Sequence, residues 1–327
     1  GVSKLVYTSS AGVIYNGQED LVNADERLDF PLVPLDAYNE TKAQAEKMVL
    51  DANCAELRTC ALRPAGIFGP GDRQMISGFY NVMKNNQTRF QIGNNDNLFD
   101  WTYVGNVAHA HLLAVDKLTS VYPLDGFRES LASVDISVGN HKIPTSESRP
   151  LGPNQNPTEE DLLAAKKFAA QGSDSETDVR PVLRTKMDQF SNEANMDCAE
   201  DGPAVAGQAF FITNCEPLYF WDFARTIWRN LGHVPPYVIA IPASIGLVLA
   251  SLSEAFSKLR GKEAGFTKFR VTFATQQRYY DVERARRLLG YEPIVSVEEG
   301  MKRWTDWYSG ELERLKRVES EETEKTK

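Results

Sequence analysis

The chain has 327 residues, of which 42% are apolar and 25% charged, so it can bury a real core and is not globally disordered. Its 36 Lys and Arg residues against 45 Asp and Glu residues give a formal net charge of −9, which argues against a nucleic-acid surface. The four cysteines (Cys54, Cys60, Cys198 and Cys215) form no C-x-x-C pair, so neither a disulfide framework nor a metal site is predicted.

The first residue is glycine, and an apolar stretch follows at once. Lys4 to Ser9 is short, apolar and β-branched, and small polar residues follow it, which predicts a buried strand. A parallel strand needs neighbouring strands in its sheet. We therefore expect that this chain is a fragment and that earlier strands are missing from its N-terminus.

The next hundred residues alternate between strand and helix patterns. Asp36 is placed to cap a helix over 37–53, and residues 57–64 predict a strand that ends in a loop rich in proline and glycine. Residues 77–86 predict a helix, and 90–115 predict a short strand, a turn and another helix. This rhythm is typical of an α/β protein with a parallel sheet and helical crossovers.

The character of the sequence changes between residues 119 and 205, where Pro, Ser, Asn and Asp are frequent and aromatic residues are few. We predict a long insertion there, partly disordered and without a recognisable site. Order returns with a strand in 207–214 and an amphipathic helix in 217–232 that Gly232 closes. The last residues, 313–327, predict a charged, solvated helix.

The most apolar stretch runs from Tyr237 to Leu252, and Pro242 interrupts it. Its sixteen residues fall short of the roughly twenty that a membrane-spanning helix needs. The favoured interpretation is a helix of the core or of a substrate pocket. The alternative is a helix that dips into one face of a bilayer, with basic residues following it (Lys258, Arg260 and Lys262).

Tyr38 and Lys42 lie four residues apart on the helix predicted after Asp36, so their side chains share a helix face. A phenol has an ordinary pKa of about 10, and a neighbouring ammonium favours the phenolate, which makes general acid/base chemistry possible at neutral pH. Ser10 follows the first predicted strand and offers a hydroxyl donor for a developing oxyanion. Y-x-x-x-K is a weak signal by itself, because such pairs are common on solvated helices.

Several longer motifs make the signal specific. "VYTSSAGV", "YNETKAQAEKMVL", "LRPAGIFGPGD", "DWTYVGNVAHAHLLA" and "LGYEP" occur in this order. The chain resembles the extended short-chain dehydrogenases/reductases, specifically the 3β-hydroxysteroid dehydrogenase family and its decarboxylating sterol-4α-carboxylate branch. The resemblance covers the chain except much of the insertion, and it implies an incomplete Rossmann-type, doubly wound parallel sheet with a smaller C-terminal substrate domain.

The resemblance also implies roles for individual residues. Ser10, Tyr38 and Lys42 would be catalytic, with Tyr38 as the acid/base and Lys42 tuning it and binding the nicotinamide ribose. The implied contacts to NAD or NADP are Thr8, Ser9, Tyr38, Lys42, Pro64, Ala65, Gly66 and Ile67. The implied reaction is oxidation of the 3β-hydroxyl of a 4-carboxysterol to a 3-ketone, with loss of the carboxylate as CO2, in ergosterol-type sterol biosynthesis.

The expected organisation follows from the same resemblance. Residues 1–118 would form the part of the Rossmann domain with the catalytic residues, 119–205 the insertion, 206–312 the remaining strand with a substrate- and membrane-associating region, and 313–327 a charged tail. The expected partners are a sterol carboxylate, other enzymes of sterol C4-demethylation, a membrane surface and a second copy in a homodimer. The expected location is the cytosolic face of the endoplasmic reticulum membrane.

One family motif is absent from this sequence: the G-x-x-G-x-x-G loop that cradles the pyrophosphate after the first strand. The nearest match, Gly66 to Gly71, has no predicted strand–glycine–helix context, and Asp72 beside it would repel a phosphate. We therefore expect this chain to bind dinucleotide poorly and to turn over little.

Two alternatives stay open at this point. A sugar-nucleotide epimerase or dehydratase of the same superfamily shares the serine, tyrosine and lysine, although the apolar segment after Val234 and the absence of obvious basic residues for a second diphosphate favour a sterol. A truncated, non-catalytic binding or scaffold protein would keep the Tyr38 pocket unused. The missing glycine loop supports that second alternative.

Overall fold

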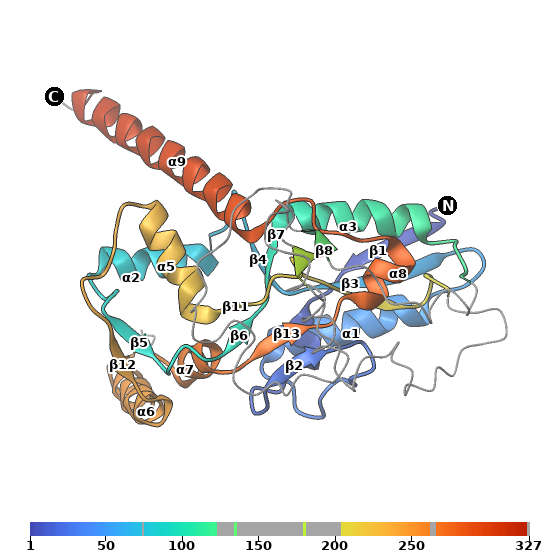
Figure 1. Ribbon diagram of the computed structural model, residues 1–327, viewed down its shortest axis with the longest axis horizontal. Helices are drawn as coiled ribbons and strands as arrows, with labels where there is room; N and C mark the ends of the chain where they lie inside the picture. Colours follow the sequence, from blue (N-terminus) through green and yellow to red (C-terminus); the bar gives the residue numbers. More distant parts are fainter. Residues whose placement is uncertain (74, 123–133, 136–178, 181–203, 262–265, 326–327) are drawn as a thin grey trace, which may run out of the picture.

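The structure is a computed structural model, shown in Figure 1. It describes residues 1–73, 75–122, 134–135, 179–180, 204–261 and 266–325. Most of the predicted insertion at 119–205 therefore lies outside the described residues, and its expected disorder stays a prediction.

A parallel sheet of three strands carries the site. Its order is β1 (Lys4–Thr8), β3 (Arg58–Pro64) and β10 (Ala209–Ile212). All three strands were predicted, and the rule that parallel strands need crossover connections is followed, since long segments separate them. β3 and β10 are buried, whereas β1 lies at the edge of the described sheet with Leu5 40% exposed, so the prediction of a buried first strand is wrong.

The other strands are short. They are β2 (Leu21–Ala24), β4 (Gly66–Phe68), β5 (Phe90–Ile92), β6 (Leu98–Phe99), β7 (Trp101–Tyr103), β8 (Val134–Asp135), β9 (Val179–Arg180), β11 (Leu218–Tyr219), β12 (Ile239–Ile241) and β13 (Arg278–Tyr280). The helices are η1 (Ala11–Ile14), α1 (Ala37–Asp51), α2 (Met75–Lys84), α3 (Val104–Lys117), α5 (Phe220–Asn230), α6 (Ala243–Arg260), α7 (Lys268–Thr275), α8 (Glu283–Leu289) and α9 (Val297–Lys325).

Helices cover both faces of the sheet. Successive side chains of a strand point to opposite faces, so one strand can contact helices on both sides. Cys60 and Leu62 of β3 belong to a buried cluster with residues of α3 and α8. Thr59 and Arg63 face the other way, and the Thr59 hydroxyl donates to the Val49 carbonyl of α1 at 2.7 Å. The arrangement is that of a Rossmann-type, doubly wound sheet.

A second sheet lies beside the first and joins distant parts of the chain. Its order is β11, β6, β13 and β2, and β13 runs parallel to both β6 and β2. The pairs β4–β7 and β5–β12 are also parallel. Strands from the predicted intervals 1–118 and 206–312 therefore share sheets, which places the start of α1 and the strand β13 around one space.

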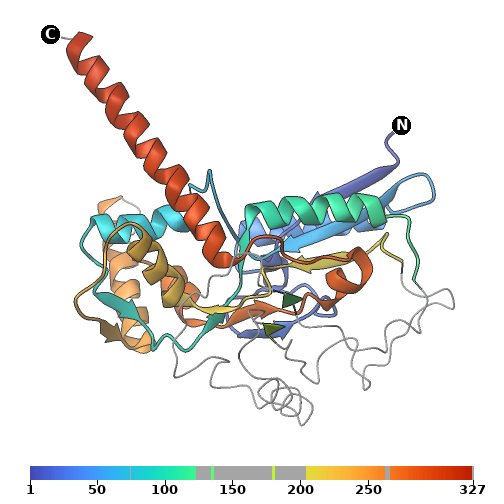
Figure 2. The same cartoon turned by 45° about the horizontal axis from the view of Figure 1, so that its top comes forward.

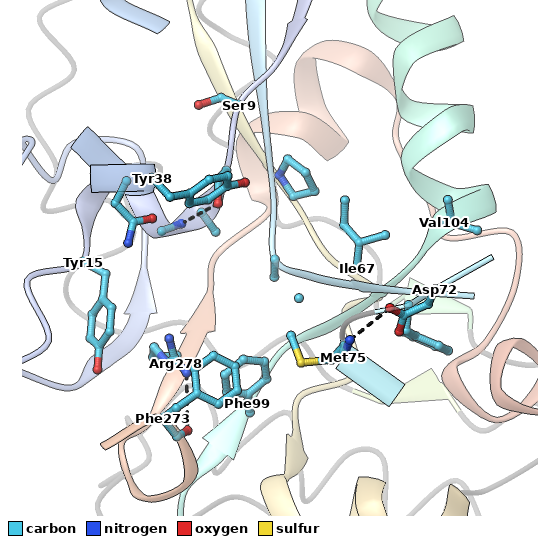
Figure 3. A pocket seen from close by; sticks show the side chains of 18 of the residues that line it. Ser9, Tyr15, Tyr38, Ile67, Asp72, Met75, Phe99, Val104, Phe273 and Arg278 are labelled. Atoms are coloured by element: carbon cyan, nitrogen blue, oxygen red, sulfur yellow. Dashed lines mark hydrogen bonds between the residues drawn. The ribbon is translucent and has the colours of Figure 1, made fainter. Parts of the chain in front are cut away.

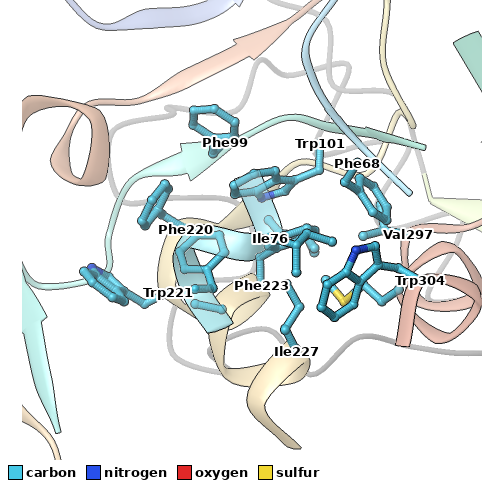
Figure 4. Packing of buried hydrophobic residues seen from close by; sticks show 14 of the residues in the cluster. Phe68, Ile76, Phe99, Trp101, Phe220, Trp221, Phe223, Ile227, Val297 and Trp304 are labelled. Atoms are coloured by element: carbon cyan, nitrogen blue, oxygen red, sulfur yellow. The ribbon is translucent and has the colours of Figure 1, made fainter. Parts of the chain in front are cut away.

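Buried aromatic side chains form the largest core cluster, between α2, α5, β7 and the start of α9 (Figure 4). Trp101 stacks on Phe223 with ring centroids 3.8 Å apart and an interplanar angle of 8°. Trp304 of α9 is fully buried in the same cluster. Beyond this anchor α9 projects from the body of the molecule, as Figures 1 and 2 show, so the described part of the predicted tail, residues 313–325, is the end of a much longer helix.

The apolar segment 237–252 differs from its favoured interpretation. Pro242 precedes α6, and the chain before it forms the short strand β12 instead of helix. Ile245, Val248 and Leu252 of α6 are 52%, 60% and 62% exposed, so α6 is not a core helix. Among the described residues, no helix has the length and apolarity needed to cross a membrane.

Candidate active site

A cavity of about 740 Å³ lies at the carboxyl ends of β1 and β3 (Figure 3). This is the edge of an open α/β sheet at which ligands bind, because the crossover helices begin there. The start of α1, the turn after β4, α7 and β13 complete its walls. Its lining includes Ser9, Ser10, Tyr15, Tyr38, Asn39, Pro64, Ala65, Gly66, Ile67, Phe99, Phe269, Phe273 and Arg278.

The first turn of α1 carries the predicted acid/base into this cavity. Asp36 caps the helix as predicted, and its carboxylate accepts a hydrogen bond from the Asn39 amide at 2.8 Å. Tyr38 follows two residues later, is 57% exposed and lines the cavity. A phenol in this position is accessible to a ligand and is held on a rigid helix rather than on a loop.

Lys42 lies one turn further along α1 and points to the end of β1. Its ammonium donates to the Thr8 carbonyl at 2.8 Å and lies 5.0 Å from the centroid of the Tyr7 ring. Lys42 is not among the residues that line the cavity. The lysine is thus fixed beside the strand from which Ser9 and Ser10 follow, at the same edge of the sheet as Tyr38.

The two serines after β1 have different roles in the structure. Ser10 caps η1, and its hydroxyl oxygen accepts from the Gly12 amide at 3.1 Å, which leaves its proton for another acceptor. Gly12 packs closely against α1, since a Cβ there would stand 2.3 Å from Asn39 Oδ1 and would displace that side chain. Ser9 is buried, lines the cavity, and its hydroxyl has no hydrogen-bond partner in the described structure.

Thr8, the other residue expected to contact a cofactor, does not line the cavity. Its hydroxyl is bonded to Nε2 of His111 at 2.6 Å, and the His111 Nδ1 atom lies 2.8 Å from the Val107 carbonyl. A ring nitrogen next to a carbonyl must donate, so Nε2 accepts the Thr8 proton. The Thr8 side chain therefore ties β1 to α3.

The predicted cofactor segment from Pro64 to Ile67 lines the cavity along its whole length. It runs from the end of β3 into β4, and Gly66 sits where a Cβ would approach the Phe99 ring at 3.1 Å. Ser9 lines the same cavity, and its hydroxyl is buried without a hydrogen-bond partner in the described structure. The segment Pro64–Ile67 fits the nicotinamide end of NAD or NADP, because its backbone offers polar atoms for a carboxamide beside the phenol of Tyr38.

The glycine-rich turn after Phe68 does not form a phosphate cradle. Contrary to the predicted context, a strand does precede it and a helix does follow it, namely β4 and α2. The Asp72 carboxylate, however, accepts from the amides of Met75 and Ile76 at 3.0 and 2.9 Å and so occupies the N-terminus of α2. An acidic group in this place leaves no room for a phosphate.

Sequence reasoning missed the C-terminal wall of the cavity, where β13 contributes Arg278. Its guanidinium is buried and lies against three aromatic rings, those of Tyr15, Phe99 and Phe273. Burial lowers the pKa of Arg278, while Tyr280 and Tyr15 act in the opposite direction. The sequence showed no obvious basic residue for a second diphosphate, yet the cavity contains Arg278, and an arginine at the start of the stretch "RYYDV" was the signal available.

One buried acid, Asp100, and one phenol of the cavity wall, Tyr15, have raised pKa values. Burial raises the pKa of Asp100 to about 7, although the Tyr280 amide donates to its carboxylate at 2.8 Å. Burial also raises the pKa of Tyr15, against the effect of Arg278, and the Tyr15 hydroxyl donates to the Gln276 side chain. Within the described ranges, no group of three or more His, Cys, Asp or Glu residues is placed to hold a metal ion.

The chain is similar in sequence to several known proteins. The sequence profile of the 3-beta hydroxysteroid dehydrogenase/isomerase family matches residues 1–127 and 193–243. The chain is 41% identical, over 95% of its length and 67% of the relative's, to the sterol-4-alpha-carboxylate 3-dehydrogenase, decarboxylating, of Schizosaccharomyces pombe. The corresponding protein of Saccharomyces cerevisiae is 42% identical over 94% of the chain and 66% of its own length.

A human protein of the same name is 30% identical over 93% of the chain and 61% of its own length. The chain thus spans about two thirds of the length of the curated relatives it matches. Among solved structures, that of gox2253 (TM-score 0.52, 16% identity, 95% and 67% covered) has a similar fold. So has the epimerase of Methanothermobacter thermautotrophicus (TM-score 0.51, 18% identity, 97% and 62% covered). The chain belongs to the 3-beta hydroxysteroid dehydrogenase/isomerase family.

Proposed function

We propose that the protein oxidises the 3β-hydroxyl of a 4-carboxysterol to a 3-ketone with NAD or NADP, and that the C4 carboxylate then leaves as CO2. One observation carries this proposal: Tyr38, Ser10 and the segment Pro64–Ile67 line a single cavity. The chain that builds this cavity is 41–42% identical to two relatives named for that reaction.

The residues around the cavity supply the proton chemistry. NAD(P)+ is the hydride acceptor when it is bound. Tyr38 takes the proton of the 3-hydroxyl, while the Ser10 hydroxyl donates to the same oxygen as it becomes a carbonyl. Lys42, held on the Thr8 carbonyl, places a positive charge at the edge of the sheet where Tyr38 lies.

Loss of CO2 follows from the product of the oxidation. A 3-ketone next to a C4 carboxylate is a β-keto acid, so the electrons of the breaking C–C bond pass into an enolate on the C3 oxygen. In this proposal Ser10 and Tyr38 donate to that oxygen too, which stabilises the enolate. The same two donors therefore serve both steps, and a proton returned to C4 completes the ketone.

The test is turnover by the protein in its full natural length, with a 4α-carboxysterol and either NAD+ or NADP+. Reduced cofactor is followed by absorbance and CO2 by release of label from the carboxylate. Tyr38→Phe should lower the rate at least about 100-fold, as loss of a general acid/base does. Tyr122→Phe, a tyrosine that does not line the cavity, is the control, and a Tyr38→Phe rate equal to the parental rate contradicts the assignment.

A membrane surface is the proposed location, and the exposed apolar side of α6 supports it. α6 packs on α7, and Phe269 of α7 is 48% exposed while it also lines the cavity. Apolar surface thus extends from α6 to the site, which suits a substrate dissolved in lipid. α6 and α7 carry four basic residues against the single acid Glu254, although the whole chain is acidic, and this favours an anionic membrane face such as that of the endoplasmic reticulum.

The chemistry also indicates the neighbouring steps. An oxidation must supply the C4 carboxylate, and a reduction must consume the 3-ketone that remains. Enzymes of sterol C4-demethylation are therefore the proposed partners, and a homodimer stays a prediction.

A further inference from the structure

Arg278 is a buried cation that the proposed proton chemistry does not use. It is 7% exposed, lines the cavity, and lies 4.0 Å from the Phe273 ring centroid and 4.7 Å from the centroids of both Tyr15 and Phe99 (Figure 3). Aromatic faces attract a guanidinium but accept none of its N–H hydrogen bonds in the plane of the group. The rings therefore hold the guanidinium in place and leave its edges to other partners.

Those partners are few in the described structure. Nη2 donates to the Phe273 carbonyl over 3.3 Å, and Nε is buried without a hydrogen-bond partner. No described Asp or Glu forms an ion pair with Arg278. A buried charge without a counter-ion is costly, and a donor without an acceptor adds to that cost. A ligand carboxylate would supply both the missing counter-ion and the missing acceptor.

The acids that line the same cavity do not fill this role. The Asp36 carboxylate is bonded to the N-terminus of α1, and the Asp72 carboxylate to that of α2. In Figure 3, Arg278 lies with Phe99 and Phe273 on the side of the cavity away from Asp72. Neither carboxylate is therefore the acceptor that Arg278 lacks.

We propose that Arg278 is a specificity-determining residue that binds the C4 carboxylate of the sterol through its guanidinium. This inference rests on the proposed function. Guanidinium and carboxylate form two parallel hydrogen bonds, which fix direction as well as charge. The C4 carboxylate is attached to the carbon next to C3, so holding it turns the 3-hydroxyl toward the wall that carries Tyr38. A sterol without that carboxylate leaves Arg278 unpaired and is rejected.

The experiment measures binding without cofactor, so that it does not depend on turnover. Isothermal titration in detergent micelles compares a 4α-carboxy-3β-hydroxysterol with the 4α-hydroxymethyl sterol of the same skeleton, which is close in size and neutral. The parental protein should bind the carboxylate at least tenfold more tightly. Arg278→Met should weaken binding of the carboxylate alone, so that the ratio of the two dissociation constants falls to about one. Arg278→Lys keeps the charge but not the two parallel donors of the guanidinium, so it should retain part of the ratio of the dissociation constants.

Two control variants locate the effect. Arg303→Met removes an arginine that also lies against an aromatic ring, that of Tyr103, but does not line the cavity, and it should keep the full ratio. Arg73→Met removes the exposed arginine at the rim of the cavity and should keep it too. The proposal is overturned if Arg73→Met loses the ratio of the two dissociation constants while Arg278→Met keeps it. It is also overturned if Arg278→Lys, with a parental melting temperature, weakens the binding of both sterols equally.

A third ligand separates this inference from the function on which it rests. Binding of UDP-glucose, but of neither sterol, by the parental protein refutes the sterol function and the carboxylate site together. Binding of both sterols with equal affinity by the parental protein refutes the carboxylate site alone. Preference for the carboxylate that disappears only in the Arg278 variants supports both.

Discussion

Arg63 of β3 and Glu46 of α1 form a buried, forked ion pair. The Arg63 Nη2 and Nε atoms lie 2.6 and 3.0 Å from Glu46 Oε1, and Glu46 is fully buried. The rings of Phe30 and Phe211 lie 5.4 and 5.3 Å from the guanidinium and shield the pair. Since Glu46 follows Lys42 by one turn of α1, this pair fixes the helix that carries the candidate catalytic residues onto the sheet.

Replacing one partner of this pair should destabilise the fold strongly. Glu46→Gln leaves the Arg63 charge buried and uncompensated, and we expect the free energy of unfolding to fall by about 3–5 kcal/mol. Urea unfolding measures this change. Glu40→Gln, an exposed glutamate on the same helix, is the control and should have little effect. Equal midpoints for the two variants would show that the pair does not anchor α1.

Lys42 should matter for turnover more than for stability, because it is partly exposed and bonds only the edge of β1. We expect Lys42→Met to lower kcat about 100-fold or more, as loss of a group that supports a general base does. Its unfolding midpoint should stay close to the parental one. The matched control is Lys47→Met on the exposed side of α1; a Lys42→Met enzyme with parental kcat would remove the lysine from the mechanism.

Asp100 should make stability depend on pH in the direction opposite to an ordinary carboxylate. Its pKa is raised by burial to about 7, so the folded state binds more protons than the unfolded state between the ordinary value of 3.8 and about 7. Stability from this group is therefore present at low pH, is lost as pH rises through this range, and changes no further above about 7. The slope is at most about 1.4 kcal/mol per pH unit.

Asp100→Asn removes this titration and keeps an acceptor for the Tyr280 amide. In urea unfolding, the free energy of unfolding of the variant relative to that of the parent should therefore increase from about pH 5 to about pH 7. Asp116→Asn, exposed on α3, provides the comparison. A relative stability that stays constant with pH would mean that Asp100 titrates normally in the fold.

The apolar side of α6 should bind anionic vesicles. Val248 and Leu252 lie one turn apart and are both more than half exposed, so replacing both by Ser should reduce co-flotation with vesicles that contain anionic phospholipid. Leu112 and Val115 of α3 are likewise exposed, and their double Ser variant is the control. Equal flotation of the two double variants would count against a membrane role for α6.

Local patterns predicted those elements whose residues interact with near neighbours in sequence. Asp36 identified the start of α1 because a cap bonds an amide three residues away. The alternation of strand and helix indicated a parallel sheet, and the motifs around Tyr38 and Ser10 indicated the family that the comparisons confirm. The interpretation of the segment 237–252 as a core helix was wrong because apolarity alone does not say whether a helix faces a core or the surface.

By itself, the sequence determined the family, the α/β rhythm and the residue types for proton transfer, since these are carried by contiguous motifs. Only the tertiary structure decided that Arg278 enters the cavity, that Lys42 bonds Thr8 and that α6 lies exposed. Each of these depends on which strands and helices become neighbours after folding: β13 reaches the site through pairing with β2 and β6, more than 170 positions away in the chain. Long-range pairing of this kind is fixed by the burial of whole layers, and no short stretch of sequence contains it.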